Sequence, residues 1–314
     1  MSIRQISILV FCILTLSLFC CLATISEAGI IFDHTAVDLF DSLTATDVSN
    51  VQDNIRWHYA HTSHGGQITT GLQRIEDAYL GQAVQFNISR TSQALPTNSN
   101  SLNIFDGQQH DTYISPDEYW STGTGIGYTN AVLSSNPSIN VSQWSWCTQM
   151  NSYNPTQTQS YLAQISAFEA AHPDVIFIYM TGTAEDDYQG STGYNRYQNN
   201  QLIRSWVSSG ANRILFDFAD LDAWAKDPET GTWSQNTYLY NDVNVPTEHS
   251  ALIGSGYGHT SALSAEQKAK ASWVMMDQVY KTQIAPEPIS TVLFLSGGLP
   301  LGLGLFRRKL RGLL

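Results

Sequence analysis

The stretch Val175-Ile176-Phe177-Ile178-Tyr179-Met180 is the clearest indication of the fold class in this chain of 314 residues. It is a nearly continuous apolar and β-branched run, which is typical of a strand that is buried on both faces of a sheet. A second run of this kind, Arg213-Ile214-Leu215-Phe216-Asp217-Phe218, follows it. Because such strands occur where helices cover both faces, the two runs together indicate an α/β protein with a parallel sheet.

Three further strand-like runs and four helical patterns surround these two. The five predicted strands span residues 55–60, 83–88, 139–147, 174–180 and 213–218. The helical patterns span residues 67–80, 159–171 and 197–208, and a last helix begins at Ser264, which with Gln267 has the spacing of a capping box. Strands that alternate with helices form mostly parallel sheets. We therefore predict a three-layer α/β/α sandwich with a mostly parallel sheet of about five strands, flavodoxin-like in layout.

Two irregular stretches interrupt this rhythm, at residues 91–128 and 222–257. Both are rich in polar residues and carry aromatic side chains, among them Trp120 and Trp233. Long insertions in a compact domain are commonly lids or binding loops, and aromatic rings are suited to stacking against sugars. We predict that both insertions belong to a single domain, residues 29–285, and form walls of its binding site.

The first 28 residues have the pattern of a secretory signal peptide. Arg4 provides the positive charge, residues 6–23 are mostly apolar, and Ser26-Glu27-Ala28 has the small-x-small pattern of a cleavage site before Gly29. We therefore expect an exported protein whose folded part begins at Gly29.

The opposite end carries a second sorting pattern. Pro286-Glu287-Pro288 precedes an uncharged apolar segment, residues 289–306, and then Arg307-Arg308-Lys309-Leu310-Arg311. A helix of this length can span a bilayer, and the basic cluster is expected to stay cytoplasmic. This order resembles the PEP-CTERM signal of Gram-negative bacteria. The resemblance implies processing of residues 286–314 by an exosortase-type enzyme, transient membrane attachment, and a final location in the periplasm, at the outer surface or in the extracellular matrix.

The net charge of the domain argues against one class of partner, and its cysteine content argues against an internal disulfide. The two terminal segments hold five of the 15 basic and two of the 27 acidic residues, so the domain itself has a net charge near −15. Such a surface repels phosphate backbones, and we expect no nucleic-acid partner. Three of the four cysteines lie in the first 28 residues, which leaves Cys147 without a partner for a disulfide within the domain.

In an open parallel sheet, ligands bind beyond the carboxyl ends of the strands. The segments that follow the predicted strands are therefore the candidates for a functional site. They are His61-Thr62-Ser63-His64-Gly65-Gly66, Trp146-Cys147-Thr148-Gln149-Met150-Asn151, Thr181-Gly182-Thr183-Ala184-Glu185, the aspartates Asp217, Asp220 and Asp222, and the late loop Gly256-Tyr257-Gly258-His259-Thr260-Ser261.

Ser63 is the candidate nucleophile, because it lies between a strand and a glycine-rich helix start. Backbone N–H groups at such a helix start are free to stabilise an oxyanion. A serine also needs a base, usually a histidine that a carboxylate orients. The predicted catalytic residues are Ser63, the base His259 and, to orient the base, Asp217 or Asp220; the residues predicted to bind the oxyanion or the substrate are His64, Gly65, Gly66, Gln149, Asn151 and Gly182. No metal ion or other cofactor is predicted.

Three alternatives stay open at this point. Thr62 or Ser63 can simply cap the following helix, with no chemical role. The three histidines in residues 58–64 suggest metal ligation, although a strand would turn residues three apart to opposite faces. Cys147 is interpreted as a small buried apolar residue, since a thiol nucleophile needs a paired histidine that a sequence cannot reveal.

The strand that leads into His61-Thr62-Ser63-His64-Gly65, the late histidine before the last helix and the strand order resemble the SGNH/GDSL-type hydrolases. The resemblance covers most of the domain in layout and implies Ser63 as nucleophile and His259 as base. The sequence departs from the family at three places. Thr62-Ser63-His64 replaces Gly-Asp-Ser, Gly256 stands where the family has an aspartate, and residues 182–185 lack the family's asparagine.

The sequence thus predicts an exported, surface-sorted serine hydrolase that cleaves esters, such as acyl groups on a polysaccharide. The alternative is a non-catalytic surface protein that binds exopolysaccharide through the same aromatic walls.

Overall fold

The computed structural model describes residues 28–285. The predicted sorting tail, with its apolar segment 289–306, lies outside this range, as does the predicted signal peptide apart from Ala28. Both therefore stay predictions. Between residues 28 and 285, no helix combines the length and the apolar character that crossing a bilayer requires.

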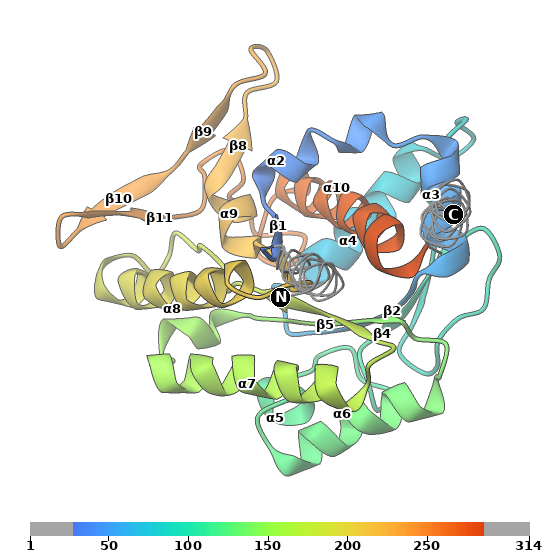
Figure 1. The fold of residues 1–314 in the computed structure, drawn as a ribbon. Coiled ribbons are helices and arrows are strands. Elements are labelled where there is room, and N and C mark those ends of the chain that lie inside the picture. Colours follow the sequence, from blue (N-terminus) through green and yellow to red (C-terminus); the bar gives the residue numbers. More distant parts are fainter. Residues whose placement is uncertain (1–27, 286–314) are drawn as a thin grey trace, which may run out of the picture.

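One central sheet of seven parallel strands confirms the predicted α/β/α sandwich (Figure 1). The strands are β1 (Ile30–Phe32), β2 (Arg56–His61), β3 (Ile88–Thr91), β4 (Leu102–Asp106), β5 (Val141–Ser145), β6 (Ile176–Met180) and β7 (Ile214–Phe216). Their order across the sheet is β1-β7-β6-β5-β2-β4-β3, and every pairing is parallel.

Helices cover both faces of this sheet. They are α2 (His34–Val37), α3 (Ala45–Asn54), α4 (Gly66–Ala78), α5 (Pro116–Tyr119), α6 (Gly123–Ser135), α7 (Pro155–Ala171), α8 (Gly190–Ser208), α9 (Phe218–Ala223) and α10 (Ala262–Val279). Helix α10 packs on α2, α3 and α4, whereas α7 packs on α8. Figure 1 shows α3, α4 and α10 on one side of the sheet and α5, α6 and α7 on the other.

Burial on both faces explains the unbroken apolar character of the central strands. All five residues of β5 are buried, and so are four of the five in β6. Trp144 in β5 and Trp146 just after it are both buried, with ring centroids 4.8 Å apart. Large rings of this kind contribute much of the buried apolar area that stabilises the layers.

The structure corrects several predicted boundaries. The prediction of a strand at residues 83–88 is wrong, because β3 occupies Ile88–Thr91. The predicted insertion 91–128 contains the fully buried strand β4 and the start of α6, whose glycine-rich sequence has a weak helical pattern. Ser264 does not cap α10. The helix begins at Ala262, and the side chain of Ser261 accepts the cap hydrogen bond from the Ser264 N–H.

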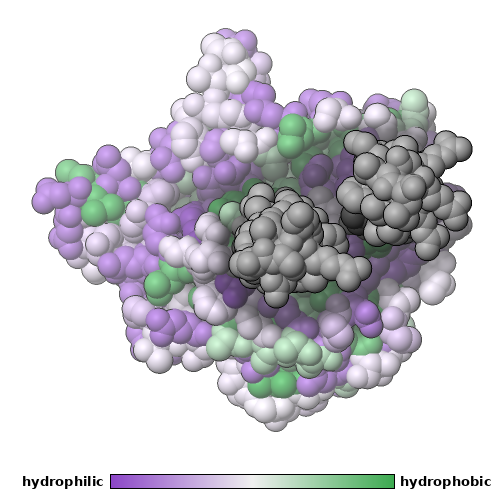
Figure 2. Space-filling view, viewed as in Figure 1, coloured by the Kyte–Doolittle hydropathy of each residue, from purple (hydrophilic) through white to green (hydrophobic). Residues whose placement is uncertain are grey.

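The second irregular stretch, 222–257, forms two antiparallel hairpins. Strands β8 (Trp224–Lys226) and β9 (Trp233–Gln235) make one, and β10 (Thr237–Tyr240) and β11 (Val243–Pro246) the other. Both project from the body in Figure 1. Figure 2 shows that they are mainly hydrophilic, with a small hydrophobic group on the β10–β11 arm. The ring of Trp224 stacks on His34 at 4.3 Å, so this aromatic face already has a partner within the domain.

The strand order reverses between β2 and β5. From β2 the chain continues to β3 and β4 on one side, and then crosses to β5 on the other side of β2. In open α/β sheets, ligands bind in the crevice beyond the strand ends at such a reversal. The fold therefore singles out the loops that follow β2 and β5.

Candidate active site

Three neighbouring strands deliver three reactive side chains to one place. His64 follows β2, Cys147 follows β5 and Glu185 follows β6, and these strands are adjacent in the order β6-β5-β2. Because all three run in the same direction, their carboxyl ends meet at one edge of the sheet. His64, Cys147 and Glu185 are each nearly buried.

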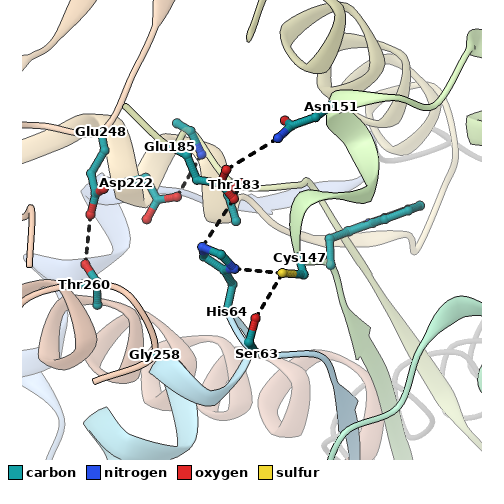
Figure 3. Close-up of polar contacts among 12 residues, drawn as sticks. Ser63, His64, Cys147, Asn151, Thr183, Glu185, Asp222, Glu248, Gly258 and Thr260 are labelled. Atoms are coloured by element: carbon teal, nitrogen blue, oxygen red, sulfur yellow. Dashed lines mark hydrogen bonds and ion pairs between the residues drawn. The ribbon is translucent and has the colours of Figure 1, made fainter. Parts of the chain in front are cut away.

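The ring of His64 lies between the other two side chains (Figure 3). Its Nδ1 atom is 3.0 Å from Cys147 Sγ, and its Nε2 atom is 3.3 Å from Glu185 Oε1. A nucleophile beside a histidine, which a carboxylate contacts on the opposite nitrogen, is the arrangement that activates serine and cysteine nucleophiles.

The surroundings of Cys147 favour its thiolate. Burial alone would raise the pKa of this thiol, but the hydrogen bond and charge of His64 outweigh burial and lower it to about 6. Ser63 Oγ at 3.0 Å from Sγ and the backbone N–H of Thr148 add to this effect. A thiol that is ionised near neutral pH is a far better nucleophile than an ordinary cysteine.

The pKa of His64 is shifted in the opposite direction to that of Cys147. Burial alone would lower the pKa of its imidazole, but the hydrogen bond and charge of Cys147, followed by the charges of Glu185 and Asp222, raise it. A lowered thiol pKa and a raised imidazole pKa together describe a thiolate–imidazolium pair. Such a pair supplies both a nucleophile and a proton donor.

Glu185 is itself held by several donors. The Thr183 hydroxyl donates to Oε1 at 2.9 Å, and Asn151 Nδ2 lies 3.5 Å from Oε2. The guanidinium of Arg196, only 1% exposed, donates to the Glu185 backbone oxygen and to Asn151 Oδ1, both at 2.8 Å. Arg196 thus joins the loops that carry Glu185 and Asn151 and limits their movement.

The segment Ser63-His64-Gly65 forms a tight turn before α4. A Cβ atom on Gly65 would lie 2.3 Å from the Cβ of His61 and 2.8 Å from that of Ser145, so this position requires glycine. No side chain caps α4. Ser63 instead directs its hydroxyl to Cys147, which leaves the proposed capping role without a hydrogen bond in this structure.

A cavity of about 430 Å³ opens in front of these residues. Ser63, His64, Cys147 and Glu185 line it, and so does His259. The ring of His259 stacks on His64, with centroids 5.1 Å apart and planes at 24°. Its backbone has φ 69°, in the left-handed region that non-glycine residues seldom occupy outside turns and functional sites.

Of the predicted catalytic residues, the structure brings Ser63 and His259 to this cavity but engages the two aspartates elsewhere. Asp217 binds Arg204 through both carboxylate oxygens, at 2.6 and 2.7 Å, and accepts from Thr181. Asp220 contacts His34 Nδ1 at 2.6 Å. Neither aspartate lines the cavity.

Of the residues predicted to bind the oxyanion or the substrate, His64 lines the cavity, whereas Gly66, Gly182, Gln149 and Asn151 have hydrogen-bond partners within the protein. The Gly66 N–H donates to the Ser63 carbonyl at 3.1 Å, and the Gly182 N–H donates to Asn200 Oδ1 at 2.8 Å, so both amides are used within the protein. Gln149 Oε1 accepts the Cys147 N–H at 2.7 Å. Asn151 supports Glu185, as described above.

The histidines that suggested metal ligation do not converge. His58 is fully buried between Ser142 Oγ and the Gly107 carbonyl, and burial lowers its pKa to about 4. His61 contacts Asp106 at 3.0 Å. Elsewhere, ligand atoms of Asp33, His34 and Asp220 lie within 4.8 Å of one another, and His34 Nδ1 lies 2.6 Å from Asp220 Oδ1. None of these three residues lines the cavity beside Cys147.

Sequence reasoning placed Cys147 and Glu185 at strand ends but missed their roles. The available signal was position, since both follow strands on the ligand side of the sheet. The pairing with His64 was not available, because it depends on which strands are neighbours. Comparison of the chain with models of protein families and with curated proteins finds no match.

Proposed function

We propose that this protein is a cysteine-dependent hydrolase of acyl compounds, with Cys147 as nucleophile, His64 as acid and base, and Glu185 as the group that orients His64. The observation that carries the proposal is the contact between Cys147 Sγ and His64 Nδ1, 3.0 Å apart, with Glu185 on the opposite nitrogen. The reaction class is the one that the sequence suggested, ester cleavage, but the nucleophile is a thiolate in place of the Ser63 hydroxyl.

In the first half of the reaction, the thiolate attacks the carbonyl carbon of the substrate and forms a carbon–sulfur bond. The imidazolium of His64 gives its Nδ1 proton to the departing oxygen or nitrogen, and the product is a thioester on Cys147. Ser63 Oγ and the Thr148 N–H interact with Cys147 Sγ, and we assign to them the stabilisation of the negative charge as it passes from sulfur to the carbonyl oxygen.

In the second half, neutral His64 accepts a proton from water, and the resulting hydroxide attacks the thioester carbonyl. The carbon–sulfur bond breaks, the acid product leaves and the thiolate–imidazolium pair is restored. His259, stacked on His64, restricts the rotation of the ring between these two steps.

Hydrolysis of p-nitrophenyl acetate and butyrate by the purified protein tests the proposal. Cys147→Ala and Cys147→Ser should both lower kcat/KM by about 10³-fold or more, since a serine hydroxyl does not ionise beside His64. Iodoacetamide should inactivate the wild type, with one adduct on Cys147 by peptide mass spectrometry. Full activity in Cys147→Ala would disprove the proposal. Loss of activity in Ser63→Ala alone would restore the serine mechanism.

We further propose, from the terminal sequence patterns alone, that the protein is exported and sorted to the surface of a Gram-negative cell by an exosortase-type enzyme. Its substrate would then be met outside the cytoplasm, for example an acylated polysaccharide. Intact-mass measurement on the protein from its native host tests this, and the mature form should end near Pro288. Retention of the basic residues 307–311 on the surface form would contradict it.

A non-catalytic role in binding exopolysaccharide is the competing hypothesis. It predicts saturable polysaccharide binding that Cys147→Ala leaves unchanged, together with no hydrolysis of either ester.

A further inference from the structure

We propose that the cavity beside Cys147 binds a positively charged part of the substrate, an ammonium or guanidinium group, through Asp186, Asp187 and Glu248. This inference deepens the proposed function and depends on it. It concerns which acyl compounds the site accepts, whereas the reactive residues remain those described above.

The wall of the cavity carries an excess of negative charge. Its acidic residues are Glu185, Asp186, Asp187 and Glu248. None of the residues of the described chain that line it is lysine or arginine. When the reactive pair is ionised, the imidazolium of His64 offsets the thiolate of Cys147, and the guanidinium of Arg196, 3.8 Å from Glu185 Oε2, partly offsets the charge of Glu185. The remaining carboxylates then determine the charge that a ligand meets.

Arg196 and Lys268, whose charges act on the carboxylates of this region, already have partners within the protein. Arg196 is buried against Asn151 and the loop of Glu185, as shown above. Lys268 is completely buried and places its Nζ 2.7 Å from Asp222 Oδ1, in an ion pair behind the cavity wall. Neither cation extends to the loop residues Asp186 and Asp187, which stand partly or fully exposed at the cavity.

Glu248 shows the effect of this crowding of carboxylates. Its Oε1 atom accepts from the Thr260 hydroxyl at 2.9 Å (Figure 3). Burial first, and then the charges of Asp222 and Asp186, raise its pKa to about 7 despite the opposing charge of Lys268. A cation bound in the cavity would relieve this repulsion and favour the ionised carboxylate, which is the direction that makes cation binding favourable.

An aromatic ring completes the rim. Tyr188 lines the cavity next to Asp187 in sequence and is about half exposed, and an aromatic ring at such a position can contribute to the binding of a cation. The volume suits one extended side chain or a small amine ester rather than a folded partner. The acidity of the whole domain should also attract a cationic substrate towards the site.

Charged and neutral methanethiosulfonates, which convert a thiol into a mixed disulfide with loss of methanesulfinate, test the inference without requiring turnover. The three reagents are the cationic 2-(trimethylammonio)ethyl, the anionic 2-sulfonatoethyl and the neutral methyl compound. Rates at Cys147 are followed by peptide mass spectrometry and divided by those of 2-mercaptoethanol. We expect the cationic reagent to be favoured over the anionic one by about tenfold or more.

Two double variants test whether the preference for the cationic reagent depends on Asp186 and Asp187. Asp186→Asn with Asp187→Asn should remove most of the preference. Asp174→Asn with Glu229→Gln, which neutralises two exposed carboxylates elsewhere, should retain it. Rapid modification of Cys147 without charge preference, or a preference that survives in the first variant, would overturn the cation site but leave the hydrolase intact. Slow modification by all three reagents would count against the hydrolase itself, and therefore against both proposals.

Discussion

The Nδ1 atom of His64 lies 3.0 Å from the Sγ atom of Cys147, although 83 positions separate the two residues along the chain. Neighbouring parallel strands bring them together, since His64 follows β2 and Cys147 follows β5. The contact converts a cysteine that resembles an ordinary core residue into an ionisable group at the mouth of a cavity.

The reactivity of Cys147 should depend on pH with a midpoint near 6. The thiolate is the reactive form, and the folded-state pKa of this thiol is lowered to about 6. The alkylation rate should therefore fall as the pH drops through 6 and stay high between pH 7 and 8, where an ordinary thiol is still mostly protonated. Iodoacetamide kinetics between pH 4.5 and 9 measure this, and a midpoint above 8 would contradict the ion pair.

Ser63→Ala should weaken the thiolate without removing the nucleophile. The variant loses the hydroxyl that lies 3.0 Å from Sγ, so the pKa of Cys147 should rise and the alkylation midpoint should move to higher pH. Esterase activity should fall by about tenfold, the effect of one lost hydrogen bond to a charged group. If activity disappears while the alkylation of Cys147 is unchanged, Ser63 is the nucleophile, as the sequence first suggested.

Glu185→Gln should reduce catalysis much more than it reduces stability. The carboxylate raises the pKa of His64 and contacts its Nε2 atom, so the amide variant loses both the charge and the orientation of the ring. We expect kcat/KM to fall by about 10²- to 10⁴-fold, as for the carboxylates of other triads. Thr183→Val, which removes one donor to Glu185, should show a smaller loss. Equal activity of Glu185→Gln and wild type would exclude a role for Glu185.

Gly65, in the turn before α4, and Gly66, the first residue of α4, can be compared directly by replacing each with alanine. Gly65→Ala would place a Cβ atom 2.3 Å from the Cβ of His61, and we expect a loss of about 1–3 kcal/mol in the free energy of unfolding. In Gly66→Ala the nearest atom is His61 Cε1 at 3.7 Å, and the change should be neutral or stabilising by up to about 1 kcal/mol. Urea denaturation of both variants measures the difference. Equal stabilities would show that the turn can relax around the added methyl group.

Most of the fold was predictable because it depends on local patterns. Continuous apolar runs such as 174–180 identify strands that are buried on both faces, and 3.6-residue periodicity identifies the helices between them. The sequence pattern did not identify the elements in which it is weak, β4 and α6. Strand β4 follows a polar, serine- and asparagine-rich segment, and α6 has glycine at three of its first five positions. Strand β4 is short and buried along its whole length, and in α6 packing overrides the low helix propensity of glycine.

The layered α/β architecture, and the side of the sheet on which a ligand should bind, could be predicted from the amino-acid sequence, because strand and helix patterns are local and parallel strands share one carboxyl edge. The sequence also identified Ser63, His64 and His259 as residues of that side. Which of these side chains are in contact depends on the three-dimensional arrangement of the strands. The order β6-β5-β2 places Glu185, His64 and Cys147 in contact, whereas Asp217 and Asp220 find Arg204 and His34. Strand order arises from long-range packing of the whole sheet and its helices. For this reason, residues that all follow a strand in the sequence can have different neighbours in the folded protein.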